Sequence, residues 1–226
     1  MLGAMATAPD PSTVLTVAVL GFVGVRLATG FQRSRTGEGR ALVRTVVGRL
    51  RWRHFWPVPI VLGCVLVLSF ALIQLPVLSW GWWTALGGEG NPVTGASTQT
   101  SGTAFEWAIP IAFLVLLLPA LPLFALAEER MFRTGAEAWS WPRRIRRTIE
   151  FGLIHAIIGI PIGVALALSC GGAYFMIVYL REFRRSGLQA EATLASTRAH
   201  TAYNLSILVL VLVLAVWTAV DWLRGA

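Results

Sequence analysis

The chain has 226 residues, of which 56% are hydrophobic and 13% are charged. Soluble globular domains carry about 25% charged residues, so this composition excludes a disordered chain, a fibrous protein and an ordinary soluble enzyme. The net charge is +8, and all 19 basic residues are arginines. Cys64 and Cys170 both lie in apolar runs, which excludes a disulfide framework and a cysteine-based zinc site.

The apolar runs predict an all-α, polytopic bundle of transmembrane helices. A helix needs about 17–25 predominantly apolar residues to cross a bilayer. In chain order, the candidate runs are 13–31, 57–80, 107–127, 149–180 and 200–223. The fourth is too long for one untilted crossing, and Ile160-Pro161 with nearby glycines can fold it into a hairpin. We therefore expect about six spans, or five if 149–180 is one long tilted helix.

The positions of the arginines predict the orientation. Seven lie in 33–53, six in 130–147 and four in 181–198, whereas the Gly-, Ser- and Thr-rich connection 81–106 has none. Because cytoplasmic loops carry the excess of basic residues, we expect the three basic segments in the cytoplasm and 81–106 outside. This requires 149–180 to leave the cytoplasm and return, which favours six spans. Both termini then lie outside an inner or plasma membrane.

The amino-terminal residues 1–12 contain no basic side chain, which argues against a cleaved signal peptide. Whether translation starts at Met1 or Met5 stays open. Arg26 interrupts the first apolar run, and we expect it to reach the inner membrane face or to pair within the bundle.

The basic connection 33–56 has an amphipathic part, 40–56, which predicts a helix on the cytoplasmic membrane surface. Its marks are three arginines at helical spacing and two tryptophans: Arg40, Arg44, Arg51, Trp52 and Trp56. A helix of this kind lies on anionic lipid, so the lipid bilayer is an expected partner. A nucleic-acid partner is not expected, because it would need a basic groove with stacking aromatic side chains.

A few polar residues lie in or at the ends of the apolar runs. An ionisable side chain at the bilayer centre costs about 2.5–3.5 kcal/mol on insertion scales and is a functional hypothesis by default. By spacing they form E-E-x-x-x-R (Glu128, Glu129, Arg133), F-x-x-x-H (Phe151, His155) and H-x-x-x-N (His200, Asn204). Residues four apart share a helical face. The third histidine, His54, is expected in contact with water in the basic connection.

Taken singly, each of these motifs has a structural explanation. A Glu-Glu-Arg cluster at a helix end is usually a solvated terminus with a local salt bridge, and a histidine in a membrane helix is usually an interhelical contact. Three motifs in this order in one chain favour a functional site instead.

The three motifs resemble those of the CPBP family of intramembrane proteases, also called the CAAX-protease or bacteriocin-processing (ABI) family. The resemblance covers about 120–210. Members of that family often read E-E-x-x-x-R-G, whereas Thr134 separates Arg133 from Gly135 in this chain, and the charged residues of the motif are unaffected.

One integral membrane domain, 1–226, is expected. Its parts are variable amino-terminal spans at 13–80 with the basic connection 33–56, an external polar loop at 81–106 and a CPBP-like core at 107–223.

The resemblance implies a catalytic set of four residues. Glu128 would be the general base that activates water, assisted by His155, and general bases typically contribute about 10²–10⁴-fold. His200 and Asn204 would hold the oxyanion, a role worth about 10²–10³-fold per donor.

Three further residues would support this set. Glu129 would pair with Arg133 and fix the helix end, and Phe151 would pack beside His155 and orient it.

A zinc site is the alternative to a metal-free mechanism. His155, His200 and Glu128 could together form a His₂Glu zinc site. The chain lacks an H-E-x-x-H helix, so a glutamate mechanism with no cofactor is favoured.

The resemblance implies an intramembrane endopeptidase, and the placement of these residues puts its action near the cytoplasmic face. Glu128 ends a span that runs inward and His200 begins one that runs outward, so both lie where the tail of a peptide or membrane-protein substrate can enter. The alternative is a non-proteolytic accessory or assembly subunit of a larger membrane complex, for example a lipid or solute transporter. The arginine-only, Ala-, Gly- and Val-rich composition suggests a GC-rich bacterial source.

Overall fold

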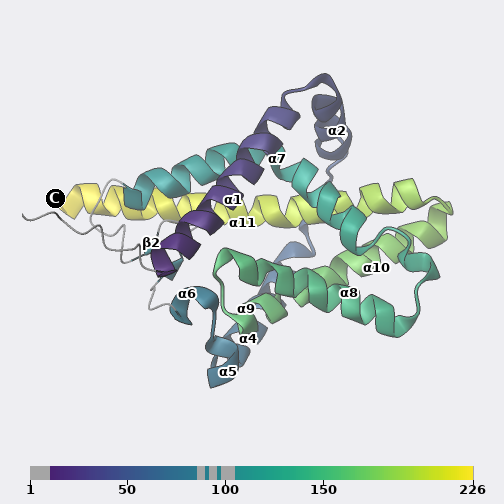
Figure 1. The fold of residues 1–226 in the computed structure, drawn as a ribbon. Coiled ribbons are helices and arrows are strands. Elements are labelled where there is room, and N and C mark those ends of the chain that lie inside the picture. Colours follow the sequence, from purple (N-terminus) through teal and green to yellow (C-terminus); the bar gives the residue numbers. More distant parts are fainter. Residues whose placement is uncertain (1–10, 86–89, 92–95, 98–104, 226) are drawn as a thin grey trace, which may run out of the picture.

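The computed structural model describes residues 11–85, 90–91, 96–97 and 105–225 of the chain, and these residues are almost entirely helical (Figure 1). The helices of the amino-terminal half are α1 (Pro11–Ser34), α2 (Gly37–Val47), α3 (Trp52–Phe55), α4 (Val58–Ile73), α5 (Pro76–Ser79) and α6 (Trp82–Ala85). A two-residue antiparallel pair follows, β1 (Gly90–Asn91) and β2 (Ala96–Ser97). The remaining elements are α7 (Phe105–Phe132), η1 (Ala136–Ala138), α8 (Trp141–Leu153), η2 (Ile154–Ile158), α9 (Ile162–Ala167), α10 (Ser169–Ser186) and α11 (Gln189–Gly225).

Four helical segments among the described residues are long and apolar enough to cross a membrane. They are Trp52–Ile73, Ile111–Ala138, Ile162–Ser186 and Gln189–Leu214. The predicted all-α class and membrane character are confirmed at this level, but six spans are not. The run 13–31 lies within α1, which is not among these four segments.

The predicted reversal within 149–180 is present. Gly159 adopts a left-handed conformation (φ 90°) that ends η2, and Pro161 precedes α9. The reversal is held by a hydrogen bond of 2.9 Å from the Ile162 N–H to the Trp80 carbonyl. The arm before the reversal is not one of the four apolar segments, because α8 carries four arginines.

The predicted amphipathic helix over 40–56 is wrong as a single helix. The chain forms α2, breaks at Gly48–Arg51, and starts again at α3. His54 is buried, contrary to the expected contact with water, and its Nδ1 accepts a hydrogen bond of 2.9 Å from the Arg51 N–H at the start of α3. Trp52 is 78% exposed, as expected of an interfacial residue.

Helix α8 is the element that is amphipathic along its length. Trp141, Ile145 and Ile149 are exposed at four-residue spacing, whereas Phe151 and Gly152 near the end of the helix are buried. Helix α8 packs against α10.

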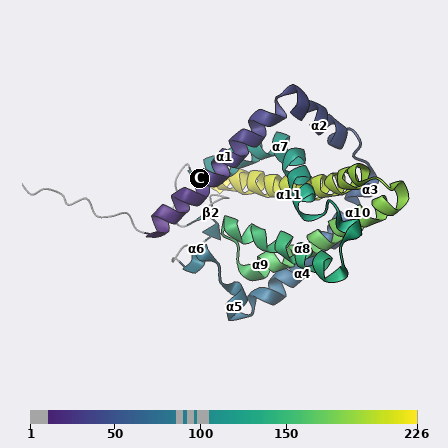
Figure 2. The same ribbon diagram turned by 45° about the vertical axis from the view of Figure 1, so that its right-hand side comes forward.

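The core lies where α7, α8, α10 and α11 meet. Figures 1 and 2 show α11 running through the molecule, with α1 and α7 on one side and α8 to α10 on the other. The buried side chains of this core are Val58, Phe132, Phe151, Phe175, Ala199 and Tyr203. Two glycines allow the close approach of α8 and α10. A Cβ at Gly152 would lie 2.8 Å from the backbone nitrogen of Ser169 at the start of α10, and one at Gly172 would lie 2.8 Å from Phe151 Cδ1.

Replacing Gly172 by alanine should destabilise the protein by about 1–3 kcal/mol, the usual cost of overpacking a dense core. The added methyl group would also lie 3.3 Å from Arg133 Nη2. Thermal unfolding in detergent measures the effect. The matched control is Gly63→Ala on α4, where a Cβ meets no described atom within 4 Å. Equal melting temperatures for the two variants would contradict the proposed tight contact of α8 with α10.

Candidate functional site

The site forms around Glu129, near the carboxyl end of α7. Its side chain is 0% exposed, and that of Arg133, one turn later, is 1% exposed. Arg133 Nη1 donates to Glu129 Oε1 at 2.9 Å, so the ion pair predicted from the four-residue spacing is present. It is a fully buried pair, not the solvated helix terminus that is the usual setting of such a cluster.

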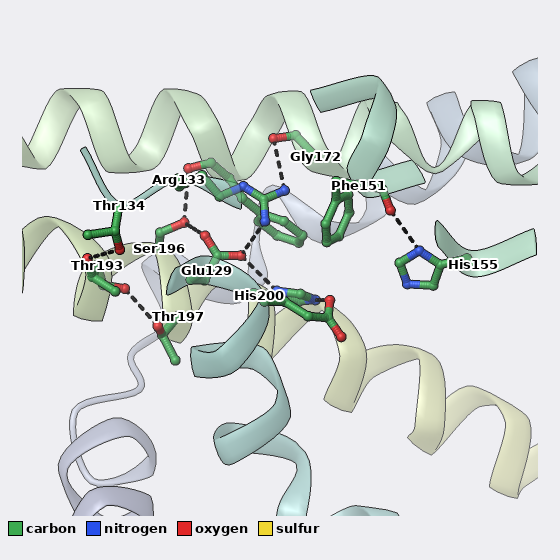
Figure 3. A network of polar contacts seen from close by, with 12 residues as sticks. Glu129, Arg133, Thr134, Phe151, His155, Gly172, Thr193, Ser196, Thr197 and His200 are labelled. Atoms are coloured by element: carbon green, nitrogen blue, oxygen red, sulfur yellow. Dashed lines mark hydrogen bonds and ion pairs between the residues drawn. The ribbon is translucent and has the colours of Figure 1, made fainter. Parts of the chain in front are cut away.

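Helix α11 supplies two further partners of this carboxylate (Figure 3). His200 Nδ1 lies 2.8 Å from Glu129 Oε1, and because a carboxylate only accepts hydrogen bonds, Nδ1 is the ring nitrogen that carries the proton. Ser196 Oγ donates to Glu129 Oε2 and lies 3.0 Å from the carbonyl of Phe175 on α10. Glu129 thus connects α7 to α11, and Ser196 extends the connection to α10.

Aromatic rings enclose the charged groups. Phe175 stacks on His200 with ring centroids 4.3 Å apart, and Phe151 meets the same imidazole edge-on at 5.6 Å. Arg133 Cζ lies 4.1 Å from the Phe151 ring centroid, a distance typical of a cation–π contact. In these apolar surroundings electrostatic interactions are stronger than in water.

Glu128 occupies the open side of this cluster. Its Oε2 lies 3.7 Å from His200 Nε2, and its side chain is 32% exposed. The Oε2 atom itself is buried and has no hydrogen-bond partner among the described residues. When the His200 ring is neutral and its one proton is on Nδ1, toward Glu129, Nε2 is an acceptor. Nε2 then faces a second acceptor, the Glu128 carboxylate.

His155 lies on the far side of Phe151 from His200 (Figure 3). Its Nδ1 is 2.8 Å from the Phe151 carbonyl, and the two rings meet at a centroid distance of 5.2 Å. The predicted packing of Phe151 beside His155 is therefore present. The structure gives no hydrogen bond or ion pair between His155 and Glu128 within the described residues, and His200 is the imidazole beside that carboxylate.

Asn204 lies one turn after His200 on α11 and is partly buried. Its side chain makes no hydrogen bond to any other described residue, so its amide can serve an added group. The predicted zinc alternative has no ready geometry: no three His, Cys, Asp or Glu side chains of the described chain are arranged to hold a metal ion.

Several residues of the site were not predicted from the sequence. Ser196 is the most informative, because it lies four residues before His200 and completes an S-x-x-x-H-x-x-x-N face on α11. That spacing could have revealed it. The carbonyl of Gly172, which accepts from Arg133 Nη2 at 3.4 Å, and the ring of Phe175 come from α10, which carries none of the three motifs.

Comparison with known proteins finds no similar protein-family model, curated protein or solved structure. These comparisons assign no family to the chain.

Replacing Glu129 by glutamine should destabilise the protein by about 3–5 kcal/mol, since it leaves the Arg133 charge buried without its counter-ion. Glu128→Gln should change stability by less than about 1 kcal/mol, because Glu128 is partly exposed and surface ion pairs contribute little. Thermal and chemical unfolding in detergent compare the two variants. The two adjacent carboxylates would have the same role if both variants unfolded alike.

Proposed function

We propose that the chain is an intramembrane endopeptidase in which Glu128 activates the attacking water, as the resemblance to CPBP proteases implies. One observation carries the proposal: His200 Nε2 and Glu128 Oε2 face each other at 3.7 Å, while Glu129 holds the other ring nitrogen. With the His200 ring neutral, the two acceptors can each accept a hydrogen bond from the same water molecule. The oxygen of that water is then polarised for attack.

The chemistry follows from these groups. Glu128 takes a proton from the water as its oxygen attacks the carbonyl carbon of the substrate peptide bond. The carbonyl oxygen becomes an oxyanion, to which the Asn204 side-chain amide can donate. When the C–N bond breaks, Glu128 returns the proton to the leaving amine. Glu129 acts as a positioning residue, because it fixes the orientation of the His200 ring.

This proposal differs from the sequence-based prediction in two roles. His200 takes the position beside Glu128 that was predicted for His155, and the oxyanion, predicted to be held by His200 and Asn204, is left to Asn204. A histidine oriented by one carboxylate while its second nitrogen faces the reacting group is a recurring catalytic arrangement.

The placement of the site suggests where substrates would be cut. If the arginine-rich segments face the cytoplasm, α7 runs inward and Glu128 lies near the cytoplasmic membrane boundary. The proposed substrate is a peptide or membrane protein whose cleavable bond lies at that depth.

Glu128→Gln should lower the rate of peptide cleavage at least about 100-fold with the fold intact, since glutamine cannot accept the proton of water. The assay uses the full chain in proteoliposomes with a library of quenched fluorogenic peptides that each contain one membrane span. Glu150→Gln, a partly exposed carboxylate paired only with Arg146 and Arg147 on α8, is the matched control. Undiminished cleavage by the Glu128→Gln protein would refute the proposal.

Chelation should leave this cleavage unchanged. Phe151 lies between the rings of His155 and His200 (Figure 3), and no three His, Cys, Asp or Glu side chains among the described residues are placed to hold a metal ion. Elemental analysis of the purified protein accompanies the assay. Stoichiometric zinc together with chelator-sensitive cleavage would establish the zinc mechanism instead.

The second candidate is a non-proteolytic subunit of a larger membrane complex. It is favoured by the partners of Glu129, whose two oxygens are both bonded to protein groups, as expected of a structural core. Purification from the native membrane in mild detergent separates the candidates. A stoichiometric partner that is retained, with unchanged function, by the Glu128→Gln protein would favour the second.

A further inference from the structure

We infer that the chain has a phosphate-binding site for an anionic lipid headgroup, formed by Arg198, Arg49 and Arg53. The site lies where the α3–α4 segment begins. The site is separate from the Glu129 cluster. Arg198 and His200 are two residues apart on α11, about 200° around the helix, so their side chains leave α11 on nearly opposite sides.

Arg198 is the residue that requires a ligand. It is only 6% exposed, and its Nε and Nη2 atoms are buried without a hydrogen-bond partner in the part of the chain that the structure describes. Guanidinium groups have five N–H donors in a fixed fork. A buried cation whose donors are unused costs several kcal/mol, so an anion that fills this fork would stabilise the fold.

The groups around Arg198 increase the positive charge. Arg49, in the turn after α2, and Arg53, on α3, both repel Arg198 electrostatically. Arg198 and Arg53 also lie within electrostatic range of the buried His54, where they disfavour a positive charge on its ring. Figure 2 shows α3 beside the junction of α10 and α11, and α3 contacts α11 directly. Three guanidinium groups from separate parts of the sequence thus converge on one region.

Two carboxylates, those of Glu191 and Glu182, lie within electrostatic range of Arg198. Neither is hydrogen-bonded to Arg198. Both oxygens of Glu182 accept from Arg185 instead, at 2.6 and 3.1 Å. Glu191 lies seven residues earlier on α11, about 10 Å along the helix axis. These carboxylates moderate the positive charge and leave the guanidinium donors of Arg198 unused.

The position of the cluster indicates a lipid as the source of the phosphate. Arg53 lies between Trp52 and Trp56, which are 78% and 55% exposed, at the start of the apolar segment Trp52–Ile73. Exposed tryptophans at the end of a span mark the headgroup level of a bilayer. Arginine binds phosphate oxygens through paired, charge-assisted hydrogen bonds.

Binding of phosphatidylglycerol to the full chain tests the inference, measured by native mass spectrometry in neutral detergent without phosphate. Arg198→Gln and the double variant Arg49→Gln/Arg53→Gln should each weaken binding at least about ten-fold, since hydrogen bonds to charged groups contribute about 1.5–3 kcal/mol. The double variant changes two exposed side chains, so it tests the site even if Arg198→Gln fails to fold. The matched control, Arg143→Gln/Arg146→Gln, removes the same charge from exposed positions on α8 and should change binding by less than about two-fold.

Three results would overturn the inference: no binding of phosphatidylglycerol, equal binding by the wild type and both cluster variants, or equal weakening by the α8 control. Inorganic phosphate is the second probe. If it displaces the lipid at millimolar concentration in an Arg198-dependent way, the site binds free phosphate and the assignment to a lipid is wrong.

Discussion

The carboxylate of Glu129 is the point at which the carboxyl-terminal helices are fixed relative to one another. A carboxylate taken out of water costs several kcal/mol unless charged and hydrogen-bonded partners replace the water. Those partners are Arg133 on its own helix and Ser196 and His200 on α11. Arg133 and Ser196 also bond to carbonyls of α10 at Gly172 and Phe175. A shift of any of these three helices by one turn would break several of these bonds together, which is why one buried charge can specify the register of the bundle.

The same cluster separates two adjacent glutamates into different roles. On a helix, neighbouring residues point about 100° apart, so Glu129 points into the bundle while Glu128 stays at its edge, 32% exposed. His200 lies between them and contacts both. Glu129 on the buried side orients the imidazole, and Glu128 on the other side keeps its side chain partly exposed. A structural cluster and a reactive site can therefore share one histidine.

The sequence was informative where a feature depends on local spacing. The helical class, the Glu129–Arg133 pair and the contact of Phe151 with His155 all follow from composition or from a four-residue separation. Features that depend on how the helices pack could not be predicted from the sequence. Nothing in the pair Glu128-Glu129 states which carboxylate faces α11, and α10 contributes Gly172 and Phe175 without carrying a motif.

Two predictions, one helix over 40–56 and six spans, are not confirmed, for local reasons that the apolar pattern does not reveal. After Gly48 the amides of Arg49 and Leu50 bond to carbonyls three residues back, at Val46 and Val47, and α2 ends. The arginines of 40–56 therefore do not continue along one helical face. In the 149–180 run, the arm before Gly159 begins with arginines on α8, so the chain reverses direction without contributing two apolar spans.

The break after α2 has a consequence for the other face of α11. Because the chain turns between Gly48 and Arg51, α3 is placed against α11, and Arg49 and Arg53 lie near Arg198 instead of spreading along a surface helix. Six ångströms of helix or less separate Arg198 from Ser196 and His200 along the α11 axis, at about 1.5 Å per residue. A headgroup bound at Arg198 would therefore hold α11 at a defined depth in the membrane, and with it the His200 ring beside Glu128. The arginine cluster at Arg198 and the buried carboxylate of Glu129 would then both act on α11. The arginine cluster would set the position of α11 relative to the bilayer, and Glu129 would set its position relative to α7 and α10.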